Sequence, residues 1–335
     1  MTEPLVSIKM ITFNHAPYIR RAIEGVLQQK VSFPIELVIG EDCSTDGTRE
    51  IVFEYQNKYP DVIRCVSSEK NVGATKNSVR TLQACRGKFV AFCEGDDYWH
   101  HPDKLQQQAD YLESHPECGL VYTSYDVYHV DKKKTIRDFI NYKKWEVPDK
   151  PTLCDFVENK WGLGLAILTC TVMVRRALHA KIVAADPFLH ENNPFRRGDS
   201  QLWAEILAVS DAHYIPESMA THIITGTSIS RGKDIVKNLQ FSVLGSELML
   251  YLCSKYNLPP NIRGIHELAW CNSSLRLAFH KRNAELAARV RARKGRFTLM
   301  EGLLYYGAGH PALHHLLRAA GLITRPFRKK TDMWL

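Results

Sequence analysis

The sequence lacks the glycine motifs that the commonest nucleotide-binding folds use to hold phosphate. No G-x-G-x-x-G follows the first apolar segment, and no G-x-x-x-x-G-K-[ST] occurs in the 335 residues. These glycines let the backbone approach the phosphates closely. Their absence therefore disfavours both an ordinary dinucleotide-binding protein and a P-loop NTPase.

Paired cysteines, a leader segment and a membrane-spanning run are also missing. The nine cysteines are scattered and form no C-x-x-C pair, which argues for a reducing compartment and against a zinc or disulfide framework. The first residues show no basic segment followed by an apolar one, so no signal peptide is visible. The longest nearly apolar run, residues 162–174, is too short to span a bilayer. We therefore expect a cytoplasmic protein.

Positive charge is concentrated near the carboxyl end. The chain has a net charge of +8, and residues 276–335 hold 13 lysines and arginines but three acids. The first 275 residues are therefore slightly acidic. Such a basic region could contact an anionic membrane surface, nucleic acid or neither.

Short apolar segments alternate with segments of helical periodicity over the first hundred residues. The expected strands are residues 5–13, 35–39, 62–66 and 88–93, and the expected helices are residues 18–29, 48–59 and 75–85. This alternation is typical of a doubly wound α/β fold with a mostly parallel sheet.

Acidic residues follow two of these strands. The apolar segment 89–93 runs directly into Glu94, Asp96 and Asp97, and the segment 35–39 is followed by Glu41 and Asp42. Open α/β sheets bind ligands at the carboxyl ends of their strands. Carboxylates this close together suit a hard cation such as Mg2+ or Mn2+, shared with a phosphorylated ligand. The alternative is a solvated acidic turn.

The rest of the chain predicts a second half of the same domain and a helical extension. We expect strands at 119–130 and 166–175, a charged loop at 131–151, a helix opening near Asp199 and a short edge strand at 213–215. Helices are expected at 239–256, 262–280, 284–293, 297–306 and 311–320. The predicted domains are 1–235, divided near residue 130, and a basic helical region at 236–335.

An ordered set of motifs resembles one family, the inverting, nucleotide-sugar-dependent glycosyltransferases of family two, which have the GT-A fold. The matching segments are 6–14, 41–48, 71–77, 94–97 and 102–105. The resemblance covers about residues 5–130. It implies a nucleotide-binding half at about 1–130 and an acceptor half at about 131–235.

The resemblance also implies roles for individual residues. Asp42 matches the acid that accepts a hydrogen bond from the donor base, and Asp96 and Asp97 match the D-x-D motif that holds ribose and the divalent metal. Glu94 occupies the first position of that motif, where the family has aspartate, and Cys43 replaces a frequent glycine or asparagine. The remaining positions that match the nucleotide-sugar site are Thr12, Asn14, Glu41 and Lys76.

The acceptor hydroxyl needs a general base, and Asp199 is the candidate because it resembles the helix-start acid of the family. A positioned base contributes about 10²–10⁴-fold. The alternative is that Asp199 is a plain helix N-cap, a position that aspartate favours. Asp186 and Glu191 are the other candidates for the base.

These features predict a metal-dependent transferase that moves one sugar, with inversion, from a nucleotide-diphosphate sugar to a hydroxyl of a glycan or lipid-linked acceptor. A UDP-sugar is favoured by the habit of the family, and bacterial surface polysaccharide is the expected setting. The processive Q-x-x-R-W motif is absent. A sugar nucleotidyltransferase would need a basic glycine-rich loop after the first strand. A non-enzymatic nucleic-acid binder would rely on the basic region. Both alternatives are disfavoured, whereas peripheral membrane contact through the basic region is kept open.

Overall fold

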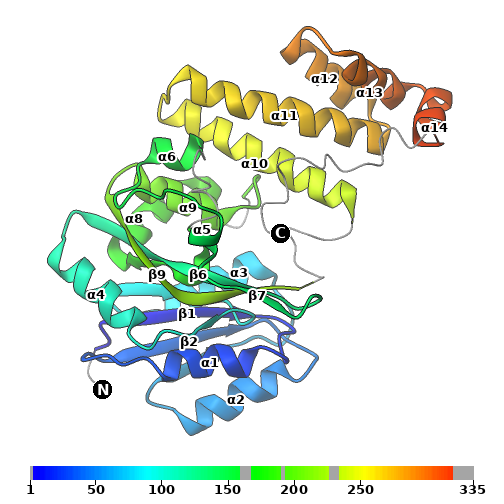
Figure 1. The fold of residues 1–335 in the computed structure, drawn as a ribbon. Helices are drawn as coiled ribbons and strands as arrows, with labels where there is room; N and C mark the ends of the chain where they lie inside the picture. Colours follow the sequence, from blue (N-terminus) through cyan, green and yellow to red (C-terminus); the bar gives the residue numbers. More distant parts are fainter. Residues whose placement is uncertain (1–2, 159–166, 190–192, 226–233, 320–335) are drawn as a thin grey trace. The chain divides into compact units, whose positions relative to one another are not determined.

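The computed structural model describes residues 3–158, 167–189, 193–225 and 234–319 (Figure 1). The chain divides into two compact units, residues 1–226 and 227–335. Each unit has a hydrophobic core of its own. The predicted α/β class with a helical carboxyl-terminal extension is confirmed.

The first unit opens with the alternation that the sequence predicts. Its elements are β1 (Val6–Thr12), α1 (Ile19–Leu27), β2 (Ile35–Glu41), α2 (Thr48–Lys58), β3 (Ile63–Val66), α3 (Ala74–Ala84), β4 (Phe89–Phe92), β5 (Tyr98–Trp99) and α4 (Lys104–Ser114). Strands β3, β2, β1 and β4 lie side by side in this order, and all three pairs are parallel.

Helices cover both faces of this parallel part of the sheet. Leu37 and Ile39 of β2 pack into the core that Ile23 of α1 and Val52 of α2 share, whereas a Cβ on Gly40 would point at Thr81 of α3. Successive residues of a strand face opposite sides. Figure 1 accordingly shows α1 and α2 on one side of β1 and β2, and α3 on the other.

The second half of the sheet is mixed. Its elements are β6 (Cys118–His129), β7 (Lys134–Ile136), α5 (Phe139–Tyr142), α6 (Leu153–Glu158), the 3-10 helix η1 (Thr169–Thr171), β8 (Met173–Arg175), α8 (Arg176–Ala185), the 3-10 helix η2 (Pro187–Leu189), α9 (Gly198–Leu207) and β9 (Asp211–Ile224). The sheet continues from β4 through β8, β6 and β9 to β5, and β7 pairs with β6.

The prediction of a short edge strand at 213–215 is wrong. Strand β9 has 14 residues and lies between β6 and β5. Its pairing passes from Ile215–Thr123 to Ser218–Ser124, so Pro216 is left outside the ladder in a bulge. A proline cannot donate to a ladder and is tolerated at bulges, which explains why the sequence pattern broke off there.

Two other predictions for this half need correction. The segment 131–151 is no simple loop, because it contains β7 and α5, and Asp138 begins α5 by accepting a hydrogen bond from the Asn141 N–H. The backbone N–H of Asp138 donates to Asp126 Oδ1 over 2.8 Å, which holds this segment against β6. The strand expected at 166–175 is reduced to β8, because η1 precedes it.

The second unit consists of helices. They are α10 (Ile235–Lys255), α11 (Pro260–Lys281), α12 (Ala284–Lys294), α13 (Leu299–Gly309) and α14 (Pro311–Ala319). Trp270 and Phe279 of α11 are buried in its core. Helix α13 begins with a capping box, in which Thr298 and Glu301 each bond the other's backbone N–H. The five helices predicted for this region are confirmed. Among the described residues, no helix has the length and apolarity needed to cross a membrane.

Candidate active site

The carboxyl ends of β1, β2 and β4 meet at one edge of the parallel sheet. Thr12 pairs with Glu41 at the ends of β1 and β2, and the Asp42 N–H donates to Thr12 O over 3.1 Å. On the other side of β1, the Gly95 N–H donates to Ile11 O over 3.0 Å. The backbone ladder therefore brings the acids that follow β2 and the acids that follow β4 to the same strand end.

Glu41 is committed to the turn that follows β2. It is fully buried, and its carboxylate accepts from the N–H of Ser44 at 2.6 Å and of Cys43 at 3.2 Å. Arg49 lies 3.4 Å from the same carboxylate. Cys43 has φ of 59°, a left-handed conformation that suits glycine and asparagine better. The hydrogen bonds from the Cys43 and Ser44 N–H groups to Glu41 thus hold the turn in a left-handed conformation that a cysteine disfavours.

Asp42 is also buried, at 2% exposure, and its carboxylate binds the loop before α3. One oxygen accepts from the Val72 N–H at 2.8 Å and the other from the Gly73 N–H at 3.0 Å. Arg80 of α3 lies 3.6 Å from Asp42 and donates to Glu41 O over 2.8 Å. Arg80 is therefore part of this strand end, although sequence reasoning missed it. The sequence feature that could have indicated Arg80 is the polar side chains of α3, which pack against Gly40 of β2.

Asn14 and Lys76 lie at the rim of this region. Asn14 has φ of 55°, its Oδ1 accepts from the Thr45 N–H at 2.9 Å, and its own N–H donates to Ser44 Oγ over 3.0 Å. It joins the loop after β1 to the loop after β2. Lys76 is exposed in the first turn of α3.

The two aspartates after β4 have different surroundings. Asp97 is 5% exposed, and its Oδ1 accepts from the Ile223 N–H at 2.8 Å and lies 3.1 Å from His222 Nδ1, both on β9. Asp96 is 28% exposed, and its Oδ2 lies 4.0 Å from His15 Nε2. Asp97 thus anchors β9, whereas the carboxylate of Asp96 is open to a ligand.

Burial and mutual repulsion change the titration of these acids. Burial first, and then the neighbouring charges of Asp97 and Asp96, together raise the pKa of Glu94 to about 8. The pKa of Asp96 is raised by the same two causes, burial first and the Asp97 charge second. Carboxyl groups held in this way gain from a cation placed among them.

Polar atoms without partners border Asp96. Thr12 Oγ1 and His15 Nδ1 are both buried and accept or donate no hydrogen bond within the described structure. A Cβ on Gly95 would lie 2.6 Å from Thr12 Oγ1 and 3.1 Å from His15 Nδ1, so a side chain at position 95 would collide with both residues. Buried polar atoms are normally paired. These orphaned atoms are what a ligand at the strand end would satisfy. Sequence reasoning missed His15, and its position directly after Asn14 was the available signal.

A divalent metal fits this strand end if it is coordinated jointly by the carboxylates and by a phosphorylated ligand. No group of three or more His, Cys, Asp or Glu side chains in the described part of the chain is assembled to hold a metal by itself. Glu94 and Asp96 nevertheless offer the oxygen atoms that Mg2+ or Mn2+ prefers, and such ions usually take the rest of their ligands from phosphates and water. The residues therefore suit a metal that arrives with a phosphorylated ligand.

Asp199 lies within the first turn of α9, and the N-cap is Arg197. The interpretation of Asp199 as a plain N-cap is therefore wrong. Its side chain is exposed, and its Oδ1 accepts from the Ser200 N–H at 2.7 Å. Burial lowers the pKa of Lys9 in β1, and the charges of Glu94 and Asp199 both oppose that shift. Asp199 thus acts electrostatically on the same lysine as Glu94.

The other candidates for the base are disfavoured or outside the described residues. Asp186 is 2% exposed, and its Oδ1 accepts from the Phe188 N–H at 2.9 Å, as expected of a residue that begins η2. Glu191 lies outside the described residues.

Comparison with known proteins defines the class. The family model "Glycosyl transferase family 2" matches residues 7–180. The putative teichuronic acid biosynthesis glycosyltransferase TuaG of Bacillus subtilis is 31% identical over 234 residues, which are 69% of this chain and 83% of TuaG. The chain therefore belongs to glycosyl transferase family 2.

In other relatives the match covers a smaller share of the relative's length. An uncharacterised protein of Mycobacterium bovis is 40% identical over 129 residues, 38% of this chain and 37% of that protein. The matching part thus spans little more than a third of this relative.

Solved structures support the fold. TarS 1-349 of S. aureus in complex with UDP-GlcNAc has a TM-score of 0.61 at 17% identity, covering 96% of this chain and 93% of that one. The mannosyltransferase PcManGT of Pyrobaculum calidifontis, in complex with GDP-Man and Mn2+, has a TM-score of 0.54 at 18% identity, covering 96% and 84%. The predicted GT-A fold is confirmed.

Proposed function

We propose that the protein transfers one sugar, with inversion, from a nucleotide-diphosphate sugar to a hydroxyl acceptor. The observation that carries the proposal is the strand end at which Asp96 lies 4.0 Å from His15 Nε2, while the buried Thr12 Oγ1 and His15 Nδ1 have no partner among the described residues. Family membership supports the class of reaction. UDP-GlcNAc and GDP-Man in two structural neighbours support a nucleotide-sugar donor.

In this proposal the donor lies across the carboxyl ends of β1, β2 and β4. Asp96, with Glu94 beside it, holds a divalent cation, which supplies positive charge to the diphosphate leaving group. The Mn2+ in the PcManGT complex supports such a requirement. Thr12 and His15 bind polar atoms of the donor. Asp42 keeps the loop before α3 in place, so the base would be recognised by this loop as well as by the carboxylate. Asp97 keeps its bonds to β9. The family resemblance predicts Asp97 as a second metal ligand, and the variants Asp96→Asn and Asp97→Asn test that prediction against the structural role proposed here.

Asp199 takes the proton of the acceptor hydroxyl in the same proposal. The exposed carboxylate is free to approach an acceptor, and it lies close enough to Lys9 for their charges to interact. Attack by the hydroxyl on the anomeric carbon opposite the leaving group inverts that carbon. A base that acts in this step contributes about 10²–10⁴-fold.

The setting we infer is the assembly of a bacterial surface polysaccharide, with a glycan or a lipid-linked saccharide as acceptor. The named role of TuaG in teichuronic acid biosynthesis supports this setting.

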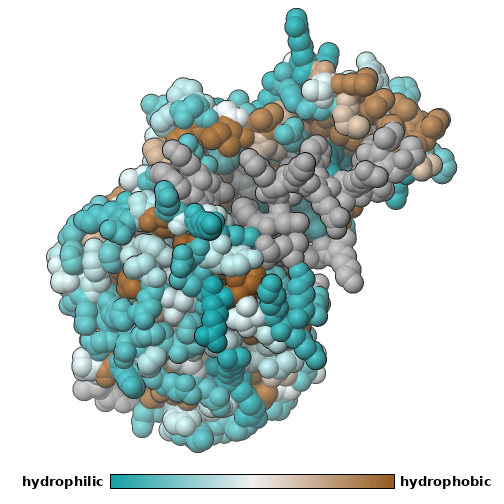
Figure 2. Space-filling model, viewed as in Figure 1, coloured by the Kyte–Doolittle hydropathy of each residue, from teal (hydrophilic) through white to brown (hydrophobic). Residues whose placement is uncertain are grey.

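Peripheral contact with the membrane is supported by the helical unit. Figure 2 shows apolar side chains gathered on this unit, where α13 and α14 lie. The exposed ones are Leu299, Met300, Tyr306 and Leu316. Basic helices with an apolar face bind anionic leaflets, and sedimentation with anionic against neutral vesicles tests this part.

A donor screen tests the reaction. The protein is incubated with a panel of UDP-, GDP- and other nucleotide sugars, with Mn2+, Mg2+ or EDTA, and release of the nucleotide is followed. We expect metal-dependent release from one donor, its loss in Asp96→Asn, and donor binding without release in Asp199→Asn. Proton NMR of the glycoside product reports whether the anomeric carbon is inverted. Release that EDTA and Asp96→Asn leave unchanged would overturn the proposal.

A further inference from the structure

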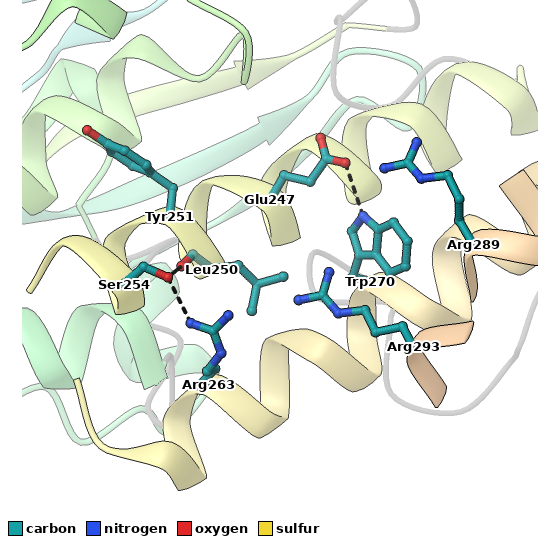
Figure 3. A pocket seen from close by; sticks show the side chains of 8 residues that line it. All are labelled: Glu247, Leu250, Tyr251, Ser254, Arg263, Trp270, Arg289 and Arg293. Atoms are coloured by element: carbon teal, nitrogen blue, oxygen red, sulfur yellow. Dashed lines mark hydrogen bonds between the residues drawn. The ribbon is translucent and has the colours of Figure 1, made fainter. Parts of the chain in front are cut away.

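A cleft of about 340 Å3 lies among α10, α11 and α12 of the helical unit (Figure 3). The residues that matter in its lining are Glu247, Ser254, Arg263, Trp270, Arg289 and Arg293. The lining thus contains three guanidinium groups and a single carboxylate. The cleft therefore carries a net positive charge, and its residues are far in sequence from the acidic strand ends.

Trp270 forms the support of this cleft. Its side chain is 3% exposed, and its Nε1–H donates to Glu247 Oε1 over 3.1 Å. The guanidinium of Arg293 lies 5.0 Å from the centre of the indole ring, and that of Arg289 lies 5.9 Å away. Figure 3 shows both groups beside the indole. Cation–π contacts at such distances hold a guanidinium in place without using its N–H donors.

The other contacts of the arginines leave most of their donors free. Glu267 receives Arg263 Nε at 3.1 Å and Arg293 Nη2 at 3.3 Å, and Arg263 Nη1 donates to Ser254 Oγ over 2.8 Å. Arg289 makes no ion pair with any of the described residues, and its one recorded contact is with Trp270. Each guanidinium has five N–H donors in a fixed fork. Several donors of the three lining arginines therefore have no acceptor among the described residues.

We propose that this cleft binds the acidic group of a saccharide, a carboxylate or a phosphate carried by a sugar unit. Arginine forks match both groups with two parallel hydrogen bonds. The volume of the cleft is at the lower end of sites for small ligands, which suits one or two sugar units. Glu247 uses Oε1 to accept from Trp270, and its second carboxylate oxygen can accept from a sugar hydroxyl. The inference goes beyond the proposed transfer reaction, because binding here requires neither donor nor turnover.

A membrane surface or a nucleic acid is a poorer match for the same residues. The cleft is small, and the exposed apolar residues of α13 and α14 that would enter a leaflet are not part of its lining. Arg291 of α12 does not line the cleft either, because it stacks on Phe297 with its guanidinium 4.9 Å from that ring. The cationic surface of α12 is thus divided, and Arg289 and Arg293 are the part directed to the cleft.

Isothermal titration of the full chain tests the proposal, with EDTA present to suppress metal-dependent donor binding. The probes are a disaccharide with a terminal glucuronic acid, the same disaccharide phosphorylated instead, its neutral parent, and inorganic phosphate. The variants are Arg289→Ala and Arg293→Ala, with Arg291→Ala as the matched control on the same helix. Circular dichroism and the Tm of each variant show whether it is folded.

We expect one or both acidic disaccharides to bind and the neutral parent to fail. Each cleft variant should weaken the binding about tenfold, the loss expected for a charged hydrogen-bonding partner. Arg291→Ala should change it by less than about twofold, as expected for an exposed charge outside the site. The two acidic probes distinguish a carboxylate from a phosphate site. Equal binding of inorganic phosphate, equal loss in Arg291→Ala, or no binding of either acidic probe would overturn the proposal. Binding to anionic vesicles or nucleic acid alone would also overturn it. None of these results depends on whether a donor is turned over.

Discussion

Gly40 of β2 should tolerate no side chain, because α3 packs directly on it. A Cβ at this position would overlap the Thr81 hydroxyl and would lie 2.7 Å from Asn77 Oδ1. Both side chains are already bonded: Thr81 Oγ1 donates to Asn77 O over 2.6 Å, and Asn77 Nδ2 donates to Gly40 O over 2.7 Å. Neither residue can move away freely, since Thr81 and Asn77 are 0% and 2% exposed.

The cost of Gly40→Ala follows from these contacts. Forcing a methyl group into a packed site costs about 1–3 kcal/mol. Disturbing one buried hydrogen bond adds about 1 kcal/mol. The lower entropy of alanine in the unfolded chain returns about 0.4–1 kcal/mol. We therefore expect the free energy of unfolding to fall by about 2–3 kcal/mol, measured by urea denaturation followed by circular dichroism.

A double-mutant cycle makes this prediction specific. Thr81→Ala removes the hydroxyl that the new methyl group would overlap, while the Thr81 Cβ, 3.1 Å from the position of the added atom, stays in place. The double variant should therefore be at least about 1 kcal/mol more stable than the sum of the single effects predicts. Gly264→Ala is the control, because a Cβ there meets no atom within 4 Å. Additive effects at positions 40 and 81 would refute the packing argument.

Three further predictions concern acid stability, the donor loop and the helical unit. His179 is 4% exposed, and burial lowers its pKa from 6.5 to about 3. Between these two pH values, the imidazole is protonated in the unfolded chain but neutral in the folded chain. Stability should fall by about 1.4 kcal/mol per pH unit between pH 6 and 4, and urea denaturation of His179→Asn should show a slope smaller by that amount. Arg80→Lys cannot replace the bond to Glu41 O together with its other contacts, so the donor Kd should rise by calorimetry while kcat changes little; an unchanged Kd would contradict this role. Thr298→Ala removes an N-cap and should cost about 1 kcal/mol in thermal unfolding, whereas Thr298→Ser should cost little; equal losses would speak against the cap.

The parallel half of the sheet could be predicted because its signals are local. Each of its strands is an apolar run that ends in turn chemistry, and each helix shows the 3.6-residue period. Strand β9 could not be predicted in full, because Pro216 and the polar residues beside it interrupt the pattern, and only the bulge against β6 shows that pairing continues. A bulge of this kind depends on the partner strand, which the local sequence does not contain.

The candidate site divides in the same way. That Asp42, Glu94 and Asp96 share one strand end followed from their positions after strands. The different surroundings of Asp96 and Asp97 did not, because the Ile223 N–H and His222 that bind Asp97 come from a strand more than a hundred residues later. The position of His15 depends on its close packing against Gly95, which is a property of the folded backbone.

The central claim is that Asp96 holds a divalent cation together with the donor, while Asp97 has a structural role. Titration of Mn2+ in the presence of the donor identified by the screen tests it most directly, with Asp96→Asn and Asp97→Asn as a pair. We predict that Asp96→Asn loses Mn2+-dependent donor binding. Asp97→Asn should keep that binding, because the asparagine Oδ1 can still accept from the Ile223 N–H, and should lose stability instead. Undiminished Mn2+-dependent binding in Asp96→Asn would contradict the account.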